Sequence, residues 1–172
     1  LQHGFGRSSD YWFRFAPYLS RHVRLACPDL RGLGRSEKPA DLNDGITVDR
    51  YMSDFLRIAD HFGAETFHFA GESSGGMLGA TLAARHPDRV RSLTLFNSSL
   101  TIRSESQRKY SHGYASWEEA LRSMGAERFA AAQNADPTRF PEGTDPGLIE
   151  WATNLRAKSD VEVMIAFSQL AR

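Results

Sequence analysis

The chain has 172 residues, 41% of them apolar, and its 21 Lys and Arg balance its 21 Asp and Glu to a formal net charge of zero. That length fits one domain with a substantial core, and the charge balance argues against nucleic acid as a partner. The single cysteine, Cys27, excludes an internal disulfide and a cysteine-rich metal site, which favours a reducing, cytoplasmic location.

Short β-type runs alternate with helical patterns, which is typical of an α/β fold with a parallel sheet and crossover helices. We expect strands at Val23–Cys27, Thr66–Ala70 and Leu93–Phe96, each buried on both faces. Leu1 is expected to be the last residue of an earlier strand. The sequence therefore predicts at least four strands.

Helical spacing of apolar residues fills the segments between these strands. Residues 10–19 predict a weak helix that Pro17 breaks or restarts. Residues 48–62 carry an apolar stripe at i, i+3, i+4 and i+7 with Thr47 as the N-cap. A further helix is expected from Ser74 to about Arg85.

The expected secondary structure changes after Ser99, because helical patterns continue there without a strand pattern. Helices are expected after Ser116, after Asp145 and from Asp160 to Leu170. We expect residues 1–99 to form the α/β core and residues 100–172 a separate helical layer.

No segment is long and apolar enough for a membrane span. The longest apolar run, Val163 to Phe167, has five residues, whereas a bilayer needs roughly 20. Because the sequence opens with Leu1 directly before a glycine turn, we expect it to be an internal piece of a longer protein. A targeting signal and the oligomeric state stay open.

The most informative motif is the G-x-S-x-G of residues 71–75, placed directly after an expected strand and before an expected helix. Such a turn holds Ser73 in a strained conformation with its hydroxyl exposed, and side chains at Gly71 and Gly75 would collide with neighbouring backbone. The free N–H of Ser74 at the helix start favours an anion on an attacked carbonyl. Ser73 is the candidate nucleophile; an ordinary Gly/Ser-rich turn is the alternative.

His3-Gly4-Phe5-Gly6 forms a second glycine-rich loop, at the end of the first expected strand. Acyl transfer needs a second N–H donor facing the nucleophile, and bare backbone at Gly4 and Gly6 allows that approach. The Phe5 N–H is the candidate, paired with that of Ser74. His3 is expected to brace the loop by hydrogen bonding, and a simple glycine turn is the alternative.

Four signatures in this order give the chain a resemblance to the core of an α/β-hydrolase. They are Leu1-Gln2-His3-Gly4-Phe5-Gly6, Pro28-Asp29-Leu30-Arg31-Gly32-Leu33-Gly34-Arg35-Ser36, Gly71-Glu72-Ser73-Ser74-Gly75-Gly76, and His86-Pro87-Asp88-Arg89-Val90 leading into Leu93-Thr94-Leu95-Phe96-Asn97. The resemblance implies a partial parallel sheet with flanking helices, followed by a helical cap in residues 100–172. It also implies that Asp29 and Arg31 brace the active-site loops.

The resemblance further implies a triad in the chain order Ser, then Asp or Glu, then His. Only His86 and His112 follow Ser73. His86 lies at the far end of the helix that Ser73 begins, and His112 falls in the cap segment, so neither fits the family's base. The acid and the histidine are expected after residue 172, where the core resumes. The 172 residues alone are expected to be nearly inactive and poorly soluble.

The implied activity is that of carboxylesterases and 3-oxoadipate enol-lactonase-like enzymes. Ser73 attacks the carbonyl of a small-molecule ester or lactone, and the amides of Phe5 and Ser74 hold the oxyanion. No metal or organic cofactor is needed. Five aromatic residues of the cap segment either line a pocket or form its core, with core favoured by their helical spacing. They are Tyr110, Tyr114, Trp117, Phe129 and Trp151.

Three alternatives remain. Residues 4–9 approximate a dinucleotide-binding G-x-G-x-x-G followed by Asp29, but Ser9 replaces its third glycine and Pro17 interrupts the next helix. The second alternative is an enzyme that opens epoxides or removes halides, but relatives with those activities carry Asp where this chain has Ser73. A non-catalytic ligand-binding member or pseudoenzyme, or a cofactor-free perhydrolase or haloperoxidase, would use the same fold.

Overall fold

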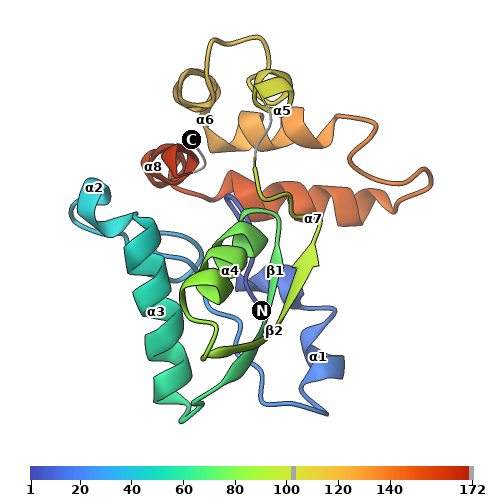
Figure 1. The fold of residues 1–172 in the computed structure, drawn as a ribbon. Coiled ribbons are helices and arrows are strands. Elements are labelled where there is room, and N and C mark those ends of the chain that lie inside the picture. Colours follow the sequence, from blue (N-terminus) through green and yellow to red (C-terminus); the bar gives the residue numbers. More distant parts are fainter. Residues whose placement is uncertain (102–103, 171–172) are drawn as a thin grey trace.

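The computed structural model describes residues 1–101 and 104–170 as a small sheet layer beneath a layer of helices (Figure 1). The elements of the sheet layer are η1 (Ser9–Trp12), α1 (Ala16–Leu19), α2 (Leu42–Gly45), α3 (Val48–His61), β1 (Phe67–Glu72), α4 (Ser74–Arg85) and β2 (Val90–Phe96). The elements of the helical layer are α5 (Ser104–Lys109), α6 (Trp117–Asn134), α7 (Pro146–Ala157) and α8 (Val161–Gln169). The helical layer lies beyond the carboxyl ends of β1 and β2 (Figure 1).

The strands β1 and β2 pair in parallel, as the alternation of strand and helix predicts. Gln2 forms a single parallel bridge with Gly71 on the other side of β1. Its amide donates to Ala70 O at 2.8 Å, and its carbonyl accepts from Glu72 N at 2.9 Å. The bridge sets the residues after Gln2 beside the carboxyl end of β1.

Three sequence expectations about strands are wrong. The described residues contain two strands, β1 and β2, and the isolated bridge at Gln2, rather than at least four strands. Residues 23–27 form no strand: in the described chain, the only backbone hydrogen bond between them and residues 1–6 runs from the Leu1 amino group to Ala26 O, at 2.6 Å. One bond does not make a ladder. Strand β2 is largely exposed rather than buried on both faces, with Leu95 and Phe96 among its exposed residues, since only β1 pairs with it in the described chain.

The predicted helices form, and the predicted N-cap Thr47 is present; Ser116 and Asp145, after which two helices are expected, also act as N-caps. The side chain of Thr47 accepts from Arg50 N, that of Ser116 from Glu119 N and that of Asp145 from Leu148 N. Such bonds satisfy amides that the first turn leaves free. Pro17 lies in the first turn of α1, so it restarts the chain as a second short helix after η1.

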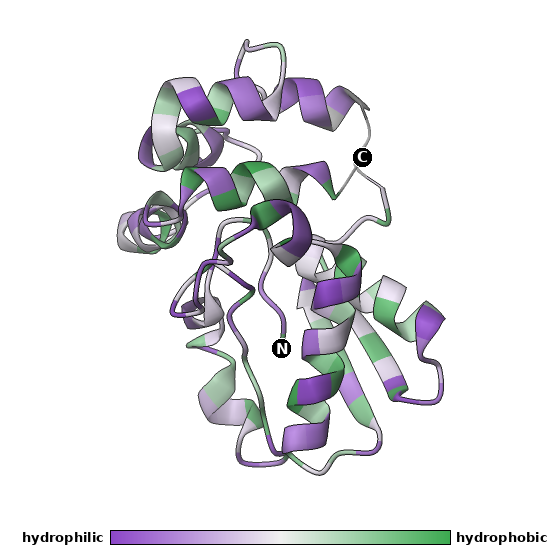
Figure 2. Cartoon of the chain, turned by 90° about the vertical axis from the view of Figure 1, so that its left-hand side faces the viewer, coloured by the Kyte–Doolittle hydropathy of each residue, from purple (hydrophilic) through white to green (hydrophobic). Residues whose placement is uncertain are grey.

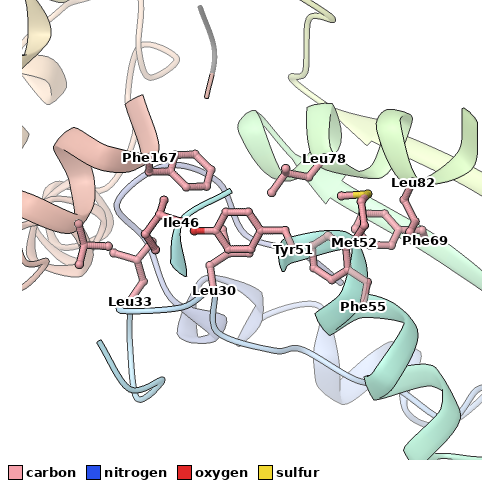
Figure 3. Packing of buried hydrophobic residues seen from close by; sticks show 11 residues of the cluster. Leu30, Leu33, Ile46, Tyr51, Met52, Phe55, Phe69, Leu78, Leu82 and Phe167 are labelled. Carbon is pink, nitrogen blue, oxygen red and sulfur yellow. The ribbon is translucent and has the colours of Figure 1, made fainter. Parts of the chain in front are cut away.

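One buried cluster unites α3, β1 and α4 with the last helix, α8. Figure 3 shows Phe167 of α8 and Leu78 of α4 near the buried ring of Tyr51. The rings of Tyr51 and Phe167 have centroids 5.6 Å apart. The helical layer is therefore fixed to the sheet layer through shared apolar burial.

A second cluster joins α6 to α8. It contains Leu121, Phe129 and Met164, each fully buried. Figure 2 shows hydrophobic stretches in both layers. Within residues 1–101 and 104–170, no helix combines the length and apolarity that a bilayer crossing requires.

Candidate active site

Ser73 stands at the junction of β1 and α4 with its backbone in the left-handed region, at φ 53° and ψ −124°. A residue other than glycine rarely adopts this conformation, which costs about 1–3 kcal/mol and persists only where neighbours enforce it. Here the Ser73 amide donates to Phe96 O at 2.9 Å, and the Ser73 carbonyl accepts from Gly76 N at 2.9 Å. The strained turn predicted from the motif is present.

The two flanking glycines lie where a side chain has no room. A Cβ on Gly71 would lie 2.5 Å from the backbone of Gly75, and a Cβ on Gly75 would lie 2.5 Å from the carbonyl oxygen of His3. Both distances are shorter than any ordinary carbon contact. Glycine at these two positions lets the start of α4 pack against β1 and against the segment that follows Gln2.

The loop of residues 3–6 lies directly against the nucleophile turn. A Cβ on Gly4 would lie 2.9 Å from the Ser73 Cβ and 2.8 Å from the Glu72 carbonyl oxygen. In the described part of the chain, neither the Phe5 nor the Ser74 amide donates a hydrogen bond to protein. The two candidate oxyanion donors are therefore brought to the same end of β1 and are both unpaired.

His3 is fully buried, and both of its ring nitrogens are engaged. Nδ1 bonds Gly4 O at 2.9 Å and Nε2 accepts from Leu30 N at 3.1 Å. Because Nε2 accepts, the ring is neutral; burial lowers the pKa of His3 to about 4, although the bond to Gly4 O and Asp29 oppose the shift. With no free ring nitrogen, His3 braces the loop and is not placed to take a proton from Ser73.

Asp29 and Arg31 each bind a segment that is distant in the sequence. The Asp29 carboxylate accepts from Ser9 N at 2.5 Å and from Arg35 N at 2.9 Å. Burial raises the pKa of Asp29, but these bonds outweigh it and the net pKa lies below the usual value. Arg31 donates two bonds to the Asp54 carboxylate, at 2.5 and 2.7 Å, which fixes its loop to α3.

A cavity of about 740 Å³ opens in front of Ser73, a size suited to a small molecule. Its walls come from the loop after Gly6, from the carboxyl end of β1 and from the helical layer. The lining includes Arg7, Glu72, Asn97, Arg139 and Trp151.

Of the five aromatic side chains singled out in the segment 100–172, some line the cavity and others lie in the core. Tyr110, Trp117 and Trp151 line the cavity, so the expectation that they form core is wrong for these three. Phe129 is fully buried and Tyr114 packs against the second cluster, as expected. Helical spacing shows that residues share a face but not whether that face covers a core or a cavity.

Sequence reasoning missed an ion pair beside the nucleophile. Arg7 Nη1 lies 2.6 Å from Glu72 Oε2, and the two side chains are only 13% and 6% exposed. Arg7 directly follows one motif and Glu72 lies inside the other, but their pairing depends on the contact between the two loops. The signal available in the sequence was the opposite charge of Arg7 and Glu72, one at each motif.

The two histidines that follow Ser73 do not line the cavity. His86 caps the far end of α4, about 18 Å from its start at 1.5 Å per residue. His112 packs edge-on against Phe129, with ring centroids 5.3 Å apart. Among the described residues, no histidine is placed to act as a base for Ser73.

The family model for the alpha/beta hydrolase fold matches residues 1–145. The chain belongs to the α/β-hydrolase fold family. It is 36% identical over 99 residues to a fluoroacetate dehalogenase from Burkholderia sp., a match that covers 56% of this chain and 33% of that protein.

Solved structures of α/β-hydrolases agree over nearly the whole chain. A hydrolase from Pseudomonas aeruginosa PA01 has a TM-score of 0.76 at 27% identity, covering 99% of this chain and 61% of that one. An enol-lactonase from Burkholderia xenovorans LB400 has a TM-score of 0.81 at 24% identity, covering 99% and 62%. The chain thus spans about three fifths of these structures and about a third of the curated relative.

The α/β-hydrolase assignment explains why Gly71, Ser73 and Gly75 lie in one strained turn between a strand and a helix. It argues against the dinucleotide-binding alternative, in which that turn has no role. In the described residues, no group of three or more His, Cys, Asp and Glu side chains is arranged to hold a metal ion.

Proposed function

We propose that Ser73 is the nucleophile of a hydrolase that cleaves small-molecule esters or lactones through an acyl-enzyme. The observation that carries this proposal is the strained Ser73 at the end of β1, facing a 740 Å³ cavity. A serine hydroxyl adds to a carbonyl carbon, forms a tetrahedral oxyanion and expels the alcohol, leaving an acyl-serine that water then hydrolyses.

The amides of Phe5 and Ser74 would hold the oxyanion in this mechanism. Both lack an acceptor in the described chain, and the Gly4 backbone brings the Phe5 amide close to Ser73. Preorganised donors of this kind contribute about 2.7–4 kcal/mol each to transition-state stabilisation.

The proton of Ser73 needs a base, and no described histidine occupies that position. We therefore propose that residues 1–172 by themselves turn over esters slowly, because a serine without its histidine loses several orders of magnitude in rate. Within the described residues, no histidine lines the cavity.

We also propose that residues 100–172 act as a cap that selects the substrate. Tyr110, Trp117 and Trp151 from this segment form the cavity wall. Aromatic walls with a few polar groups are typical of small-molecule sites. The name of the enol-lactonase structure supports a carbonyl substrate, while the dehalogenase name raises halide removal, which the serine at position 73 disfavours.

The test is hydrolysis of 4-nitrophenyl acetate by the protein expressed at the full length its gene encodes. We expect Ser73→Ala to lower kcat/KM by about 10⁴-fold or more. Ser53→Ala, on the exposed side of α3, is the matched control and should leave kcat/KM unchanged. Equal activity of Ser73→Ala and the parent protein would contradict the proposal.

A non-catalytic binding role is the second candidate, favoured by the absence of a histidine beside Ser73 in the described chain. It predicts that neither the parent protein nor Ser73→Ala hydrolyses 4-nitrophenyl acetate, while a ligand of the cavity binds to both with the same affinity. A perhydrolase would share Ser73 and is distinguished by peroxide-dependent product formation.

A further inference from the structure

The cavity in front of Ser73 carries more positive than negative charge. Its lining holds three arginines, Arg7, Arg14 and Arg139, against the single carboxylate of Glu72, a formal excess of two positive charges. For a chain whose overall net charge is zero, this local excess is a feature of the site rather than of the composition.

Only one of the three arginines is neutralised. Arg7 pairs with Glu72 at 2.6 Å. In residues 1–101 and 104–170, Arg14 and Arg139 have no ion-pair partner. Asp136, three residues before Arg139, is already bound to Lys109 at 2.5 Å, and Glu142, three residues after it, forms no ion pair in the described chain.

A fourth arginine lies behind the cavity wall. Arg156 is only 4% exposed, and its guanidinium donates to neutral acceptors, to Gln133 Oε1 at 2.5 Å and to Phe5 O at 3.3 Å. Burial lowers the pKa of Arg156 well below its usual value, and Arg7 and Arg139 lower it further. These guanidinium groups are thus close enough to repel one another.

Unpaired cations that repel each other at a partly buried site are costly unless an anion joins them. Half-buried Arg139 combines accessibility to the cavity with proximity to Arg7 and Arg156, while Arg14 is exposed at the mouth. A guanidinium binds a planar carboxylate through two parallel hydrogen bonds. The aromatic neighbours Phe140 and Trp151 disfavour a strongly hydrated phosphate dianion relative to a carboxylate on a carbon chain.

We propose that the cavity selects substrates that carry a carboxylate in addition to the ester or lactone carbonyl, with Arg139 as the principal carboxylate-binding residue and Arg14 assisting it. This inference rests on the proposed function, since Ser73 is proposed to attack the ester or lactone carbonyl of the molecule whose carboxylate Arg139 binds. Acyl transfer itself is unchanged: the Ser73 oxygen bonds to the carbonyl carbon and the alkoxide leaves as the alcohol.

The kinetic test compares 4-nitrophenyl hydrogen adipate with its neutral methyl ester, 4-nitrophenyl methyl adipate, on the protein at the full length its gene encodes. We expect a preference for the carboxylate substrate of about ten- to hundredfold in kcat/KM, which corresponds to one charge-assisted hydrogen-bonded contact. Arg139→Gln should reduce the preference to about twofold or less, and Arg139→Lys should retain part of it. Arg128→Gln, an exposed arginine of α6 outside the cavity, should retain the full preference.

A binding test separates this inference from the proposed function. Calorimetry on the Ser73→Ala variant should detect methyl hydrogen glutarate, with dimethyl glutarate binding at least about tenfold more weakly and Arg139→Gln removing the difference. If the monoanion binds in this way but no ester is hydrolysed, the carboxylate site stands and the hydrolase proposal fails.

Two results would overturn the carboxylate site. If esters with and without a carboxylate are cleaved with equal kcat/KM, the hydrolase proposal stands and the proposed selection for carboxylate substrates is refuted. Inorganic phosphate that competes more strongly than methyl hydrogen glutarate at equal concentration would refute the carboxylate as the class of anion.

Discussion

Gly4 and Ser73 approach so closely that a methyl group on Gly4 would lie 2.9 Å from the Ser73 Cβ and 2.8 Å from the carbonyl oxygen of Glu72. The contact joins two motifs that are about 70 residues apart in the sequence. It is the geometric basis for placing an oxyanion donor beside the nucleophile.

Gly4→Ala should therefore damage both folding and catalysis. Because backbone cannot withdraw from the new Cβ without a shift of the loop, we expect a loss of about 1–3 kcal/mol in the free energy of unfolding. A loop displaced by about 1 Å should lower kcat/KM by about a hundredfold. Gly147→Ala is the matched control, since a Cβ there meets only Asp145 Oδ1, at 3.0 Å. Equal activity of the two variants would contradict the predicted loop contact.

The backbone strain at Ser73 predicts an unusual ranking of two substitutions. Both Ser73→Gly and Ser73→Ala remove the hydroxyl, but only glycine adopts φ 53° without cost. Urea unfolding should show Ser73→Gly to be more stable than Ser73→Ala by about 1 kcal/mol. At Ser53, inside α3, the same pair should rank in the opposite order by about 1 kcal/mol, because glycine weakens a helix. The same order at both positions would show that Ser73 is unstrained.

The ion pair of Arg7 and Glu72 predicts asymmetric costs. Glu72→Gln leaves the Arg7 guanidinium buried without a carboxylate, so we expect a loss of about 3–5 kcal/mol in the free energy of unfolding. The double variant with Arg7→Gln should cost less than the sum of the two single changes. Asp49→Asn, which breaks the exposed pair with Arg85, should cost less than about 1 kcal/mol. Additive effects at positions 7 and 72 would show that the pair contributes no coupling.

His3 predicts a pH dependence of stability. The folded pKa of about 4 lies below the ordinary value of 6.5, so the unfolded chain binds the proton more readily. The stabilisation from the neutral ring is complete above pH 6.5 and falls by about 3 kcal/mol as the pH drops to 4. The nearest titrating group, Asp29 at 4.0 Å, opposes this loss by favouring the charged ring.

The measurement is the free energy of unfolding at several pH values between 7 and 4, for the parent protein and for His3→Asn. The variant should show a shallower decline, by about 1.4 kcal/mol for each unit of pKa shift removed. His22→Gln, at an exposed loop position, should keep the parent's decline. Identical curves for the parent and His3→Asn would mean that His3 titrates normally.

The sequence predicted the parts of the molecule that depend on local interactions. The N-cap at Thr47, the helix start after Ser116 and the turn around Ser73 are each specified within a few residues, and they form as expected. Local patterns also placed β1 and β2 within a few residues of their observed ends.

The expectations that failed depend on contacts between distant segments. Residues 23–27 have strand-like composition, but in the described chain a single backbone hydrogen bond, from the Leu1 amino group, joins them to the segment beside β1, so no ladder forms. Arg139 and Trp151 line the cavity because of how α7 and the loop before it lie over β1, and no local pattern records that arrangement. The pairing of Arg7 with Glu72 could not be predicted for the same reason, because it depends on a contact between two loops that are distant in the sequence.

The most direct measurement of Ser73 as the nucleophile is mass spectrometry of the acyl-enzyme, trapped by acid quench during turnover of 4-nitrophenyl acetate by the protein at its full encoded length. We expect an acetyl group on the peptide that contains Ser73, absent from Ser73→Ala and retained in Ser53→Ala. An acetyl group on another residue during turnover, or turnover that persists in Ser73→Ala, would contradict this expectation.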